Sequence, residues 1–176
     1  MSLTLVAPGV MMTADEFVAV NFRLWKKRPR TLFNHLLLGM AILLLSVGVY
    51  RDVTRFKQVT EWGSVVFLLV AILYAGVRMA IVRYELRRGY TKNTGLHQPI
   101  TFTFGADTLS GNSASGHFEA RWNTIRRAVW VKPNWLLLYP TEAACYYVDL
   151  RRVQTPDAPE QLLALVREAE IAVREV

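Results

Sequence analysis

The clearest feature of the hydrophobic pattern is a pair of long apolar runs in the first half of the chain. Residues 32–50 contain no Asp, Glu, Lys or Arg, and residues 63–82 contain one charged residue, Arg78, near the end of the run. Each run is about 20 residues long, which is the length that an α-helix needs to cross a hydrocarbon core of about 30 Å. Two buried helices of a soluble protein are the alternative, but such helices are usually shorter and carry a polar stripe. The pattern therefore predicts two transmembrane helices.

Basic residues are distributed unevenly around the two predicted spans. Nine lie before the first span or after the second, and three lie in the polar hinge of residues 51–62. Because cytoplasmic loops are enriched in Lys and Arg, this bias predicts a hairpin in the cytoplasmic membrane with both termini inside. The nine are Arg23, Lys26, Lys27, Arg28, Arg30, Arg83, Arg87, Arg88 and Lys92, and the three are Arg51, Arg55 and Lys57.

Residues suited to membrane anchoring lie near the ends of the spans, since Trp and Tyr rings settle at the headgroups and long basic side chains reach toward the phosphates. Arg78 lies about one turn inside the inner boundary, and we expect its side chain to extend to the cytoplasmic phosphates. The alternative is a partner within the membrane, because Asn34 and His35 lie at a similar depth. The predicted anchors are Trp25, Lys26, Lys27, Arg28, Trp62, Arg78, Arg83 and Tyr84.

Small residues recur four positions apart on the second span, as Ala71 and Ala75 and as Gly76 and Ala80. Small residues let two helices approach closely in a membrane. The pattern predicts a helix contact with a protein partner or in a homo-oligomer, without identifying the partner.

The first 30 residues are predicted to form a tail and an amphipathic helix. Residues 1–12 lack a clear periodicity and are interpreted as a mobile tail or a short edge strand. Thr13 and Glu16 form a capping box, and the helix that they begin ends before Pro29. Its apolar face suits either the membrane interface or packing on the C-terminal part of the chain, and the sequence does not decide between them.

The periodicity changes after the second span. We expect helix up to Arg88, Gly89 as the residue after the helix end, and a linker to Gln98. Apolar and polar residues then alternate in six short segments typical of half-buried strands, and a final helix follows, capped by Asp157 and Glu160. The sequence thus predicts an α+β membrane protein in which a transmembrane hairpin, residues 31–88, precedes a cytoplasmic antiparallel β domain, residues 93–176. This domain is expected to be a small barrel or sandwich closed by the C-terminal helix.

The order of these elements is accompanied by short motifs in the β domain. A strand ends in an acidic turn over residues 102–109, and a Trp-x-x-Ile step runs from Trp122 to Ile125. Together with the N-terminal helix and the two adjacent spans, they resemble the YcxB-like family of bacterial membrane proteins over nearly the whole chain. The Pro-Lys-Arg-type step that this family commonly has after its last strand is absent here. The resemblance implies a pleckstrin-homology-type (PH-like) barrel and a membrane location, and it transfers no catalytic residues.

Residues that could support catalysis do not converge in the sequence. His97 and His117 have no Glu or His nearby at the spacing of metal ligands. Cys145 is the only cysteine, so an internal disulfide is excluded, and its place in the strand alternation predicts that it points away from the core. A Cys-His pair stays open, because such pairs form in space rather than in sequence. The loop at 111–116 lacks the lysine of a P-loop. We expect no cofactor and no metal.

Charge changes this picture in one respect. The 176-residue chain carries a formal net charge of +7, and basic residues of the β domain are interleaved with Trp122, Trp130 and Trp135. They are either solvated edge charges around tryptophans of the core or a surface for anionic lipid headgroups, and we expect no nucleic acid for a membrane-tethered domain. The predicted contact residues are Arg121, Arg126, Arg127, Lys132, Arg151 and Arg152.

Three functions from different classes follow. The leading hypothesis is a non-enzymatic membrane-anchored module whose PH-like domain binds a protein partner or anionic headgroups at the inner leaflet. The second is an accessory structural subunit that docks into a larger membrane complex through its two spans. The third is a membrane enzyme with a site near Arg78, His35 and Asn34.

Overall fold

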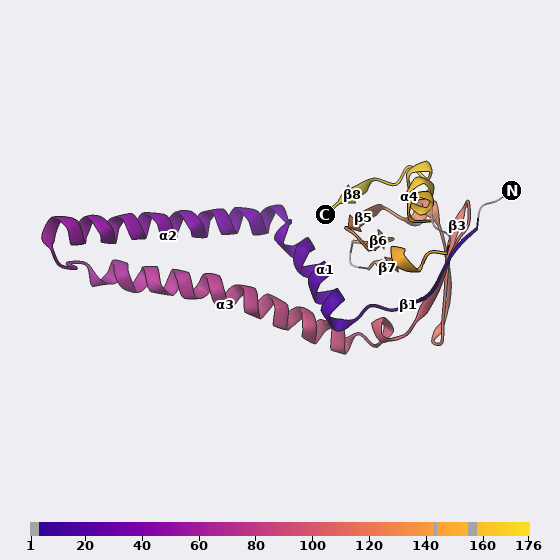
Figure 1. Cartoon of the computed structure of the whole chain (residues 1–176), viewed down its shortest axis with the longest axis horizontal. Helices are drawn as coiled ribbons and strands as arrows, with labels where there is room; N and C mark the ends of the chain where they lie inside the picture. Colours follow the sequence, from indigo (N-terminus) through magenta and orange to yellow (C-terminus); the bar gives the residue numbers. More distant parts are fainter. Residues whose placement is uncertain (1–3, 143, 155–157) are drawn as a thin grey trace. The chain divides into compact units, whose positions relative to one another are not determined.

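The computed structural model of the chain describes residues 4–142, 144–154 and 158–176 (Figure 1). It divides into two compact units. The helical hairpin comprises Asn21–Arg88, and the α+β domain combines the residues up to Val20 with Gly89–Val176. The N-terminal residues thus group with the C-terminal strands, a division that differs from the predicted boundary at residue 93.

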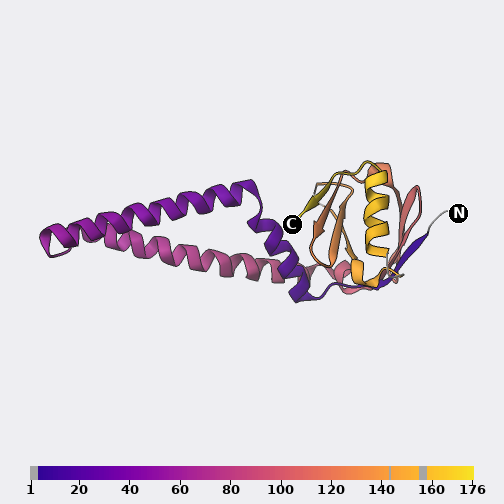
Figure 2. The same ribbon diagram turned by 45° about the horizontal axis from the view of Figure 1, so that its top comes forward.

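Two four-stranded sheets make up the α+β domain (Figure 2). The first contains, in spatial order, β1 (Leu5–Val10), β2 (Ile100–Phe104), β3 (Thr108–Ser113) and β4 (Gly116–Arg121), all antiparallel. The second contains β7 (Tyr146–Asp149), β6 (Trp135–Tyr139), β5 (Arg127–Val131) and β8 (Val173–Glu175), in which only the β5–β8 pair is parallel. The predicted α+β class and the six predicted strands are confirmed, and β1 and β8 are added to them.

The prediction of a closed barrel is wrong, because the two sheets remain separate. The chain turns out of the first sheet after β4 through a 3-10 helix, η2 (Trp122–Thr124), whose buried Trp122 donates a hydrogen bond from Nε1 to the carbonyl of Gly105 at 2.9 Å. Both sheets still contribute to a shared aromatic core. The ring of Tyr146 on β7 lies 4.5 Å from that of Phe118 and 6.4 Å from that of Phe102. The arrangement corresponds to the sandwich that was the alternative to a barrel.

The C-terminal helix α4 (Ala158–Glu168) packs on this core through buried Leu162, Leu163 and Val166. The predicted N-cap, Asp157, lies outside the described residues. Two further 3-10 turns, η1 (Thr94–His97) and η3 (Leu150–Arg152), complete the domain.

Strand β1 pairs with β2 although the whole helical segment lies between them in sequence. Val10 is opposite Ile100, and Leu5 is opposite Phe104. Of the two interpretations of residues 1–12, the edge strand is therefore the one confirmed for residues 5–10. The hairpin is an insertion between two neighbouring strands of one sheet, so its two ends are attached to the same structure.

Helix α1 (Ala14–Lys26) begins at the predicted capping box. The amide of Glu16 donates to Thr13 Oγ1 at 3.2 Å, and Glu16 Oε2 accepts from the amide of Thr13 at 3.0 Å. Within the α+β domain, the first part of this helix packs on β7, because the Phe17 ring lies 5.9 Å from that of Tyr147. Of the two predicted environments for the apolar face, packing on the C-terminal strands is the one seen at Phe17.

The two long helices of the hairpin are α2 (Pro29–Phe56) and α3 (Trp62–Lys92), and the last residues of α3 belong to the α+β domain. Among the described residues, these two helices are long and apolar enough to cross a membrane, by length and composition. Helix α3 continues past Gly89, so the predicted helix end is wrong. The added turn is held by Tyr90, whose hydroxyl donates to the carbonyl of Met12 at 2.8 Å and whose ring packs against Phe17 at 5.6 Å.

Candidate functional site

A cluster of aromatic and basic side chains lies within the hairpin unit, where the end of α1 meets α2 and α3. Trp25 is its centre. Its ring lies 5.5 Å from the rings of both Phe22 and His35, and the Arg78 guanidinium lies 5.6 Å from the Trp25 ring centroid. We call Phe22, Trp25, Lys26, His35, Arg78 and Arg83 the aromatic–basic cluster.

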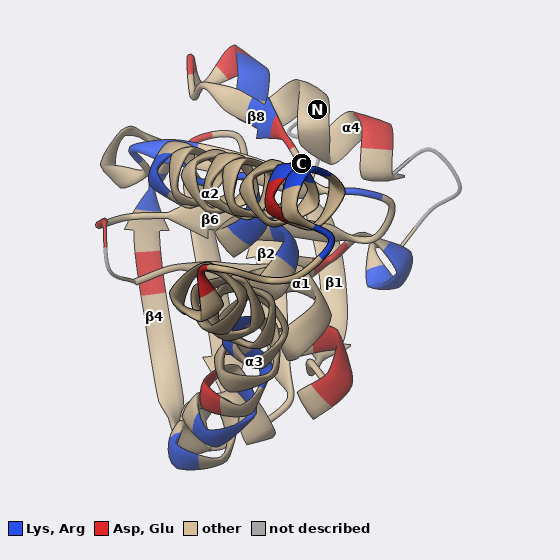
Figure 3. Cartoon of the chain, turned by 90° about the vertical axis from the view of Figure 1, so that its left-hand side faces the viewer, with Lys and Arg blue, Asp and Glu red and all other residues tan. Residues whose placement is uncertain are grey.

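Phe22 gathers two more cations into this cluster. Lys26 Nζ lies 5.0 Å and Arg83 Cζ 4.8 Å from the centroid of its ring. A cation over an aromatic face contributes about 0.5–1 kcal/mol when exposed and about 2 kcal/mol when desolvated. No carboxylate in the described part of the chain forms an ion pair with Lys26, Arg78 or Arg83. Figure 3 shows basic segments (blue) along the hairpin helices. The cluster therefore holds three cations whose charge is not neutralised by neighbouring acids.

His35 is fixed by its own helix. Its Nδ1 lies 2.6 Å from the carbonyl oxygen of Thr31, which makes Nδ1 the donor and leaves Nε2 without a proton in the neutral ring. Arg78 and His35 thus contact the same tryptophan ring, that of Trp25 on α1. The six side chains that define the cluster include neither a carboxylate nor a nucleophile.

The remaining predicted anchors lie outside the cluster. Lys27 and Arg28 are exposed in the short connection from α1 to α2, and Trp62 and Tyr84 are exposed on α3. The sequence predicted Trp25, Lys26, Arg78 and Arg83 as separate membrane anchors. It did not predict that they form one cluster, because the contacts within the cluster depend on how three helices cross.

The six basic residues predicted in the β domain do not form one surface. Arg127 begins β5 and stacks over Tyr139 at 4.4 Å, whereas Lys132 follows the other end of that strand and pairs with Glu175 at 2.6 Å. Arg151 and Arg152 both pair with buried Asp149. Arg151 Nε lies 2.8 Å from Asp149 Oδ1, and Arg152 Nε lies 3.7 Å from Oδ2. Arg121 and Arg126 are exposed.

Two of the three tryptophans of the β domain belong to its interior. Trp122 and Trp135 are buried, and half-buried Trp130 donates from Nε1 to the carbonyl of Pro133 at 3.3 Å. This placement favours the interpretation in which the domain's basic residues are edge charges around core tryptophans.

Arg151 also ties α1 to the α+β domain. Its Nη2 lies 2.7 Å from Glu16 Oε1, while its Nε lies 2.8 Å from Asp149 Oδ1. Hydrogen bonds to Asp149 and Glu16 raise the pKa of Arg151 above its ordinary value. Glu16 thus acts twice, as the capping partner of Thr13 and as an acceptor for Arg151.

Acidification is expected to weaken this connection. Burial alone would raise the pKa of Glu16, but hydrogen bonds from the Thr13 backbone, from Arg151 and from the Thr13 hydroxyl outweigh burial, so the pKa lies below its ordinary value of 4.5. Ionised Glu16 therefore stabilises the fold above about pH 4.5, and this contribution is lost as the pH falls through the lowered pKa. Denaturant unfolding at pH 7 and pH 3 should show a loss of stability for Glu16→Gln at pH 7 that shrinks at pH 3. Glu119→Gln, at an exposed position of β4, is the control and should change little; an equal deficit of Glu16→Gln at both pH values would contradict the argument.

Cys145 was predicted to point away from the core, and no contact among the described residues tests this directly. It is half-buried and lines a small cavity of about 70 Å³ with Gln98, Tyr146 and Tyr147. Next to it, the ring of Tyr147 on β7 packs against Phe17 of α1. Burial raises the pKa of the Cys145 thiol, although hydrogen bonds with Tyr147 and Tyr139 oppose this. A raised pKa disfavours the thiolate that a nucleophile needs.

The two histidines of the α+β domain have other surroundings. The His97 ring lies 4.6 Å from that of Tyr90, and His117 is exposed on β4. Within the described ranges, no group of three or more His, Cys, Asp or Glu side chains could hold a metal ion.

The small residues of α3 differ in exposure. Ala71 and Ala75 are half-buried, whereas Gly76 and Ala80 are exposed, and a Cβ added at Gly76 would meet no atom within 4 Å. The surface of α3 at Gly76 is therefore open in the described structure.

Comparisons of the chain with family models, with curated proteins and with solved structures found no match. The fold and the aromatic–basic cluster define the protein at the level of its class, an α+β domain into which a long apolar helical hairpin is inserted.

Proposed function

We propose that this protein is a non-enzymatic membrane-anchored module that engages anionic lipid headgroups at the cytoplasmic face of the membrane. The observation that carries the proposal is the bare apolar surface of the hairpin. In the most apolar 18-residue window of each helix, no residue is buried. Soluble proteins rarely expose contiguous apolar patches larger than a few hundred Å², and lipid tails are the cover that such helices require.

The pairing of β1 with β2 supports a hairpin topology. Paired strands must lie in the same compartment, so a chain that leaves the sheet after Val10 and returns at Ile100 crosses a membrane an even number of times. With the bias of Lys and Arg, this favours both termini on the cytoplasmic side. By its order of elements, we also propose that the chain belongs to the YcxB-like family.

The aromatic–basic cluster is the proposed headgroup site. Its three cations lie at the end of the hairpin that the charge bias assigns to the inner leaflet, where each basic residue near the surface contributes about 1 kcal/mol of attraction to anionic lipid. Exposed Arg121, Arg126 and Arg127 are proposed as further contacts for headgroups or for a protein partner. Lys132 and Arg151 are less suited, because they pair with carboxylates inside the domain.

Quenching of Trp25 fluorescence by brominated lipid tests this site. The full chain is reconstituted in nanodiscs of brominated phosphatidylglycerol or brominated phosphatidylcholine, and the signal of Trp25 is taken as the difference from the Trp25→Phe variant. We expect stronger quenching by the anionic lipid, and loss of that preference in Lys26→Gln/Arg83→Gln. Lys57→Gln, at the exposed connection between α2 and α3, is the control and should keep the preference. Equal quenching of the wild type by both lipids would overturn the headgroup proposal.

A further inference from the structure

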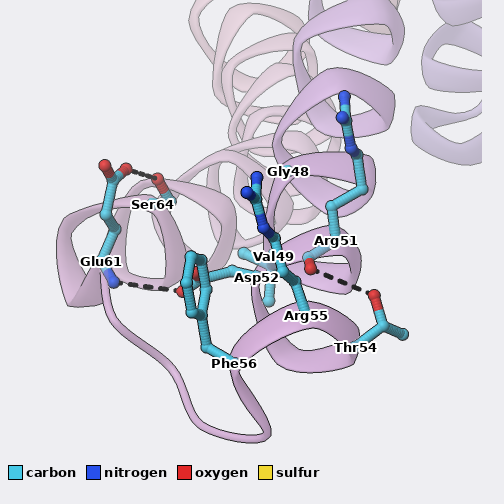
Figure 4. Close-up of a pocket in the computed structure, with 9 residues that line it drawn as sticks. All are labelled: Gly48, Val49, Arg51, Asp52, Thr54, Arg55, Phe56, Glu61 and Ser64. Atoms are coloured by element: carbon cyan, nitrogen blue, oxygen red, sulfur yellow. Dashed lines mark hydrogen bonds between the residues drawn. The ribbon is translucent and has the colours of Figure 1, made fainter.

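The other end of the hairpin holds a second charged site, lined by two arginines and two carboxylates (Figure 4). A hollow of about 500 Å³ lies between the last turns of α2 and the start of α3. Arg51, Thr54 and Arg55 line it from α2. On the opposite side it is lined by Ser64 of α3 and by Glu61, the residue before that helix. We call this the tip hollow.

The connection below the tip hollow is fixed by Asp52. Its Oδ2 accepts hydrogen bonds from the amides of Thr60 at 2.6 Å and of Glu61 at 3.2 Å, and its Oδ1 bonds the Thr60 hydroxyl. Lys57 ends α2 in a left-handed conformation with φ of 57°. The carboxylate of Asp52 is therefore occupied by the turn, and the two walls of the hollow are held in place.

Arg51 and Arg55 are one helical turn apart and so share a face of α2. Side chains of a helix lean toward its N-terminus, and Figure 4 shows both arginines extending back along α2. In the part of the chain that the structure describes, neither forms an ion pair with a carboxylate. The guanidinium of Arg55 lies over the ring of Phe56, 5.4 Å from its centroid. Two unneutralised guanidinium groups thus point from the tip toward the apolar part of the hairpin.

Exposed aromatic residues mark the same level of the hairpin. Tyr50 precedes Arg51, and Trp62 begins α3. Both are strongly exposed, as is typical of residues at the headgroup level of a membrane. Lipid phosphates lie at this level, and the planar guanidinium fork binds two phosphate oxygens at once.

We propose that the tip hollow binds the phosphate of a phospholipid headgroup in the outer leaflet, through Arg51 and Arg55. The inference rests on the proposed insertion of the hairpin, but concerns the opposite end from the aromatic–basic cluster. Free phosphate shares the chemistry and is the other source that must be tested.

Native mass spectrometry of the full chain in detergent tests the site, with phosphatidylglycerol and phosphatidylethanolamine added in turn. The wild type is expected to retain phospholipid. The Arg51→Gln/Arg55→Gln variant is expected to retain at least about fivefold less phospholipid than the wild type, because two charge-assisted contacts are lost. Lys57→Gln removes a neighbouring positive charge outside the hollow and should bind as the wild type does.

Three outcomes would overturn the inference. Equal lipid retention by the wild type and the double variant excludes the two arginines. An equal loss in Lys57→Gln shows an effect of net charge alone. Displacement of the lipid by millimolar inorganic phosphate makes free phosphate the ligand. Alkaline carbonate extraction of the same variants from membranes tests insertion of the hairpin separately. If Arg51→Gln/Arg55→Gln stays in the membrane pellet and binds lipid as the wild type does, this inference is contradicted and the proposed function stands.

Discussion

Replacing Gly111 with alanine is expected to destabilise the α+β domain strongly. Gly111 on β3 lies opposite Phe118 on β4, and the phenyl ring covers the glycine. A Cβ at Gly111 would lie 2.1 Å from Cε1 and 2.4 Å from Cζ of Phe118, so the ring must move.

The surroundings of Phe118 resist that movement. Its ring stacks on Tyr146 with 4.5 Å between centroids and 4° between planes, and Phe102 lies 6.1 Å away. Overpacking of a filled core costs about 1–3 kcal/mol, and we expect the upper part of this range because Phe118 joins the two sheets. This is a large part of the stability of a typical domain, about 5–15 kcal/mol.

Denaturant unfolding of the full chain in detergent measures the effect, with fluorescence of the buried tryptophans as the signal. A double-mutant cycle with Phe118→Ala is the control. If the clash is the cause, Gly111→Ala should cost much less once the ring is removed. Unchanged unfolding of Gly111→Ala would show that the ring can leave its place freely.

Features set by neighbouring residues were predictable from the sequence. The capping box of Thr13 and Glu16, the apolar runs of α2 and α3, and strand β6 over Trp135–Tyr139 all follow from local periodicity or local hydrogen bonding. These signals lie within one or two turns of helix or within one strand, where side-chain spacing alone determines which face is apolar.

Features that join distant residues were not predictable. The pairing of Val10 with Ile100 has no local signature, and β8 has only three residues and pairs in parallel with β5. The end of α3 was misplaced because Gly89 looked like a helix terminator, whereas Tyr90 holds the next turn through Met12. Periodicity shows which face of an element is apolar, but not which element covers it.

The candidate sites follow the same rule. Four residues of the aromatic–basic cluster, Trp25, Lys26, Arg78 and Arg83, were predicted as anchors. The contacts of Arg78 and His35 with the Trp25 ring require the crossing of three helices. In the sequence, Arg51 and Arg55 were used only in the count of basic residues in the hinge, which weakens the positive-inside bias. Their joint orientation into a hollow appears only when the turn held by Asp52 places α3 beside them.

Placing an arginine at Leu43 is expected to lower the share of the protein in the membrane fraction. Leu43 lies in the middle of the first apolar run of α2 and is 63% exposed. At the centre of a bilayer, an arginine costs about 2.5–3.5 kcal/mol on insertion scales. Adding Val70→Arg, at a similar depth on α3, should about double this cost and exceed what snorkelling of one side chain can relieve.

Val53→Arg is the matched control, because Val53 also lies exposed on α2, at 42%, but belongs to the predicted hinge. Flotation of the membranes after alkaline carbonate extraction separates inserted from soluble or aggregated protein. We expect Val53→Arg to float with the membranes, Leu43→Arg to be reduced there, and Leu43→Arg/Val70→Arg to be absent. In water, surface substitutions change stability by about 0.5 kcal/mol or less in either direction. A soluble protein would therefore tolerate both changes alike, or would tolerate the more exposed Leu43 better. Since only a lipid surrounding makes the more exposed position the more sensitive one, the order of the two variants decides whether the hairpin is inserted.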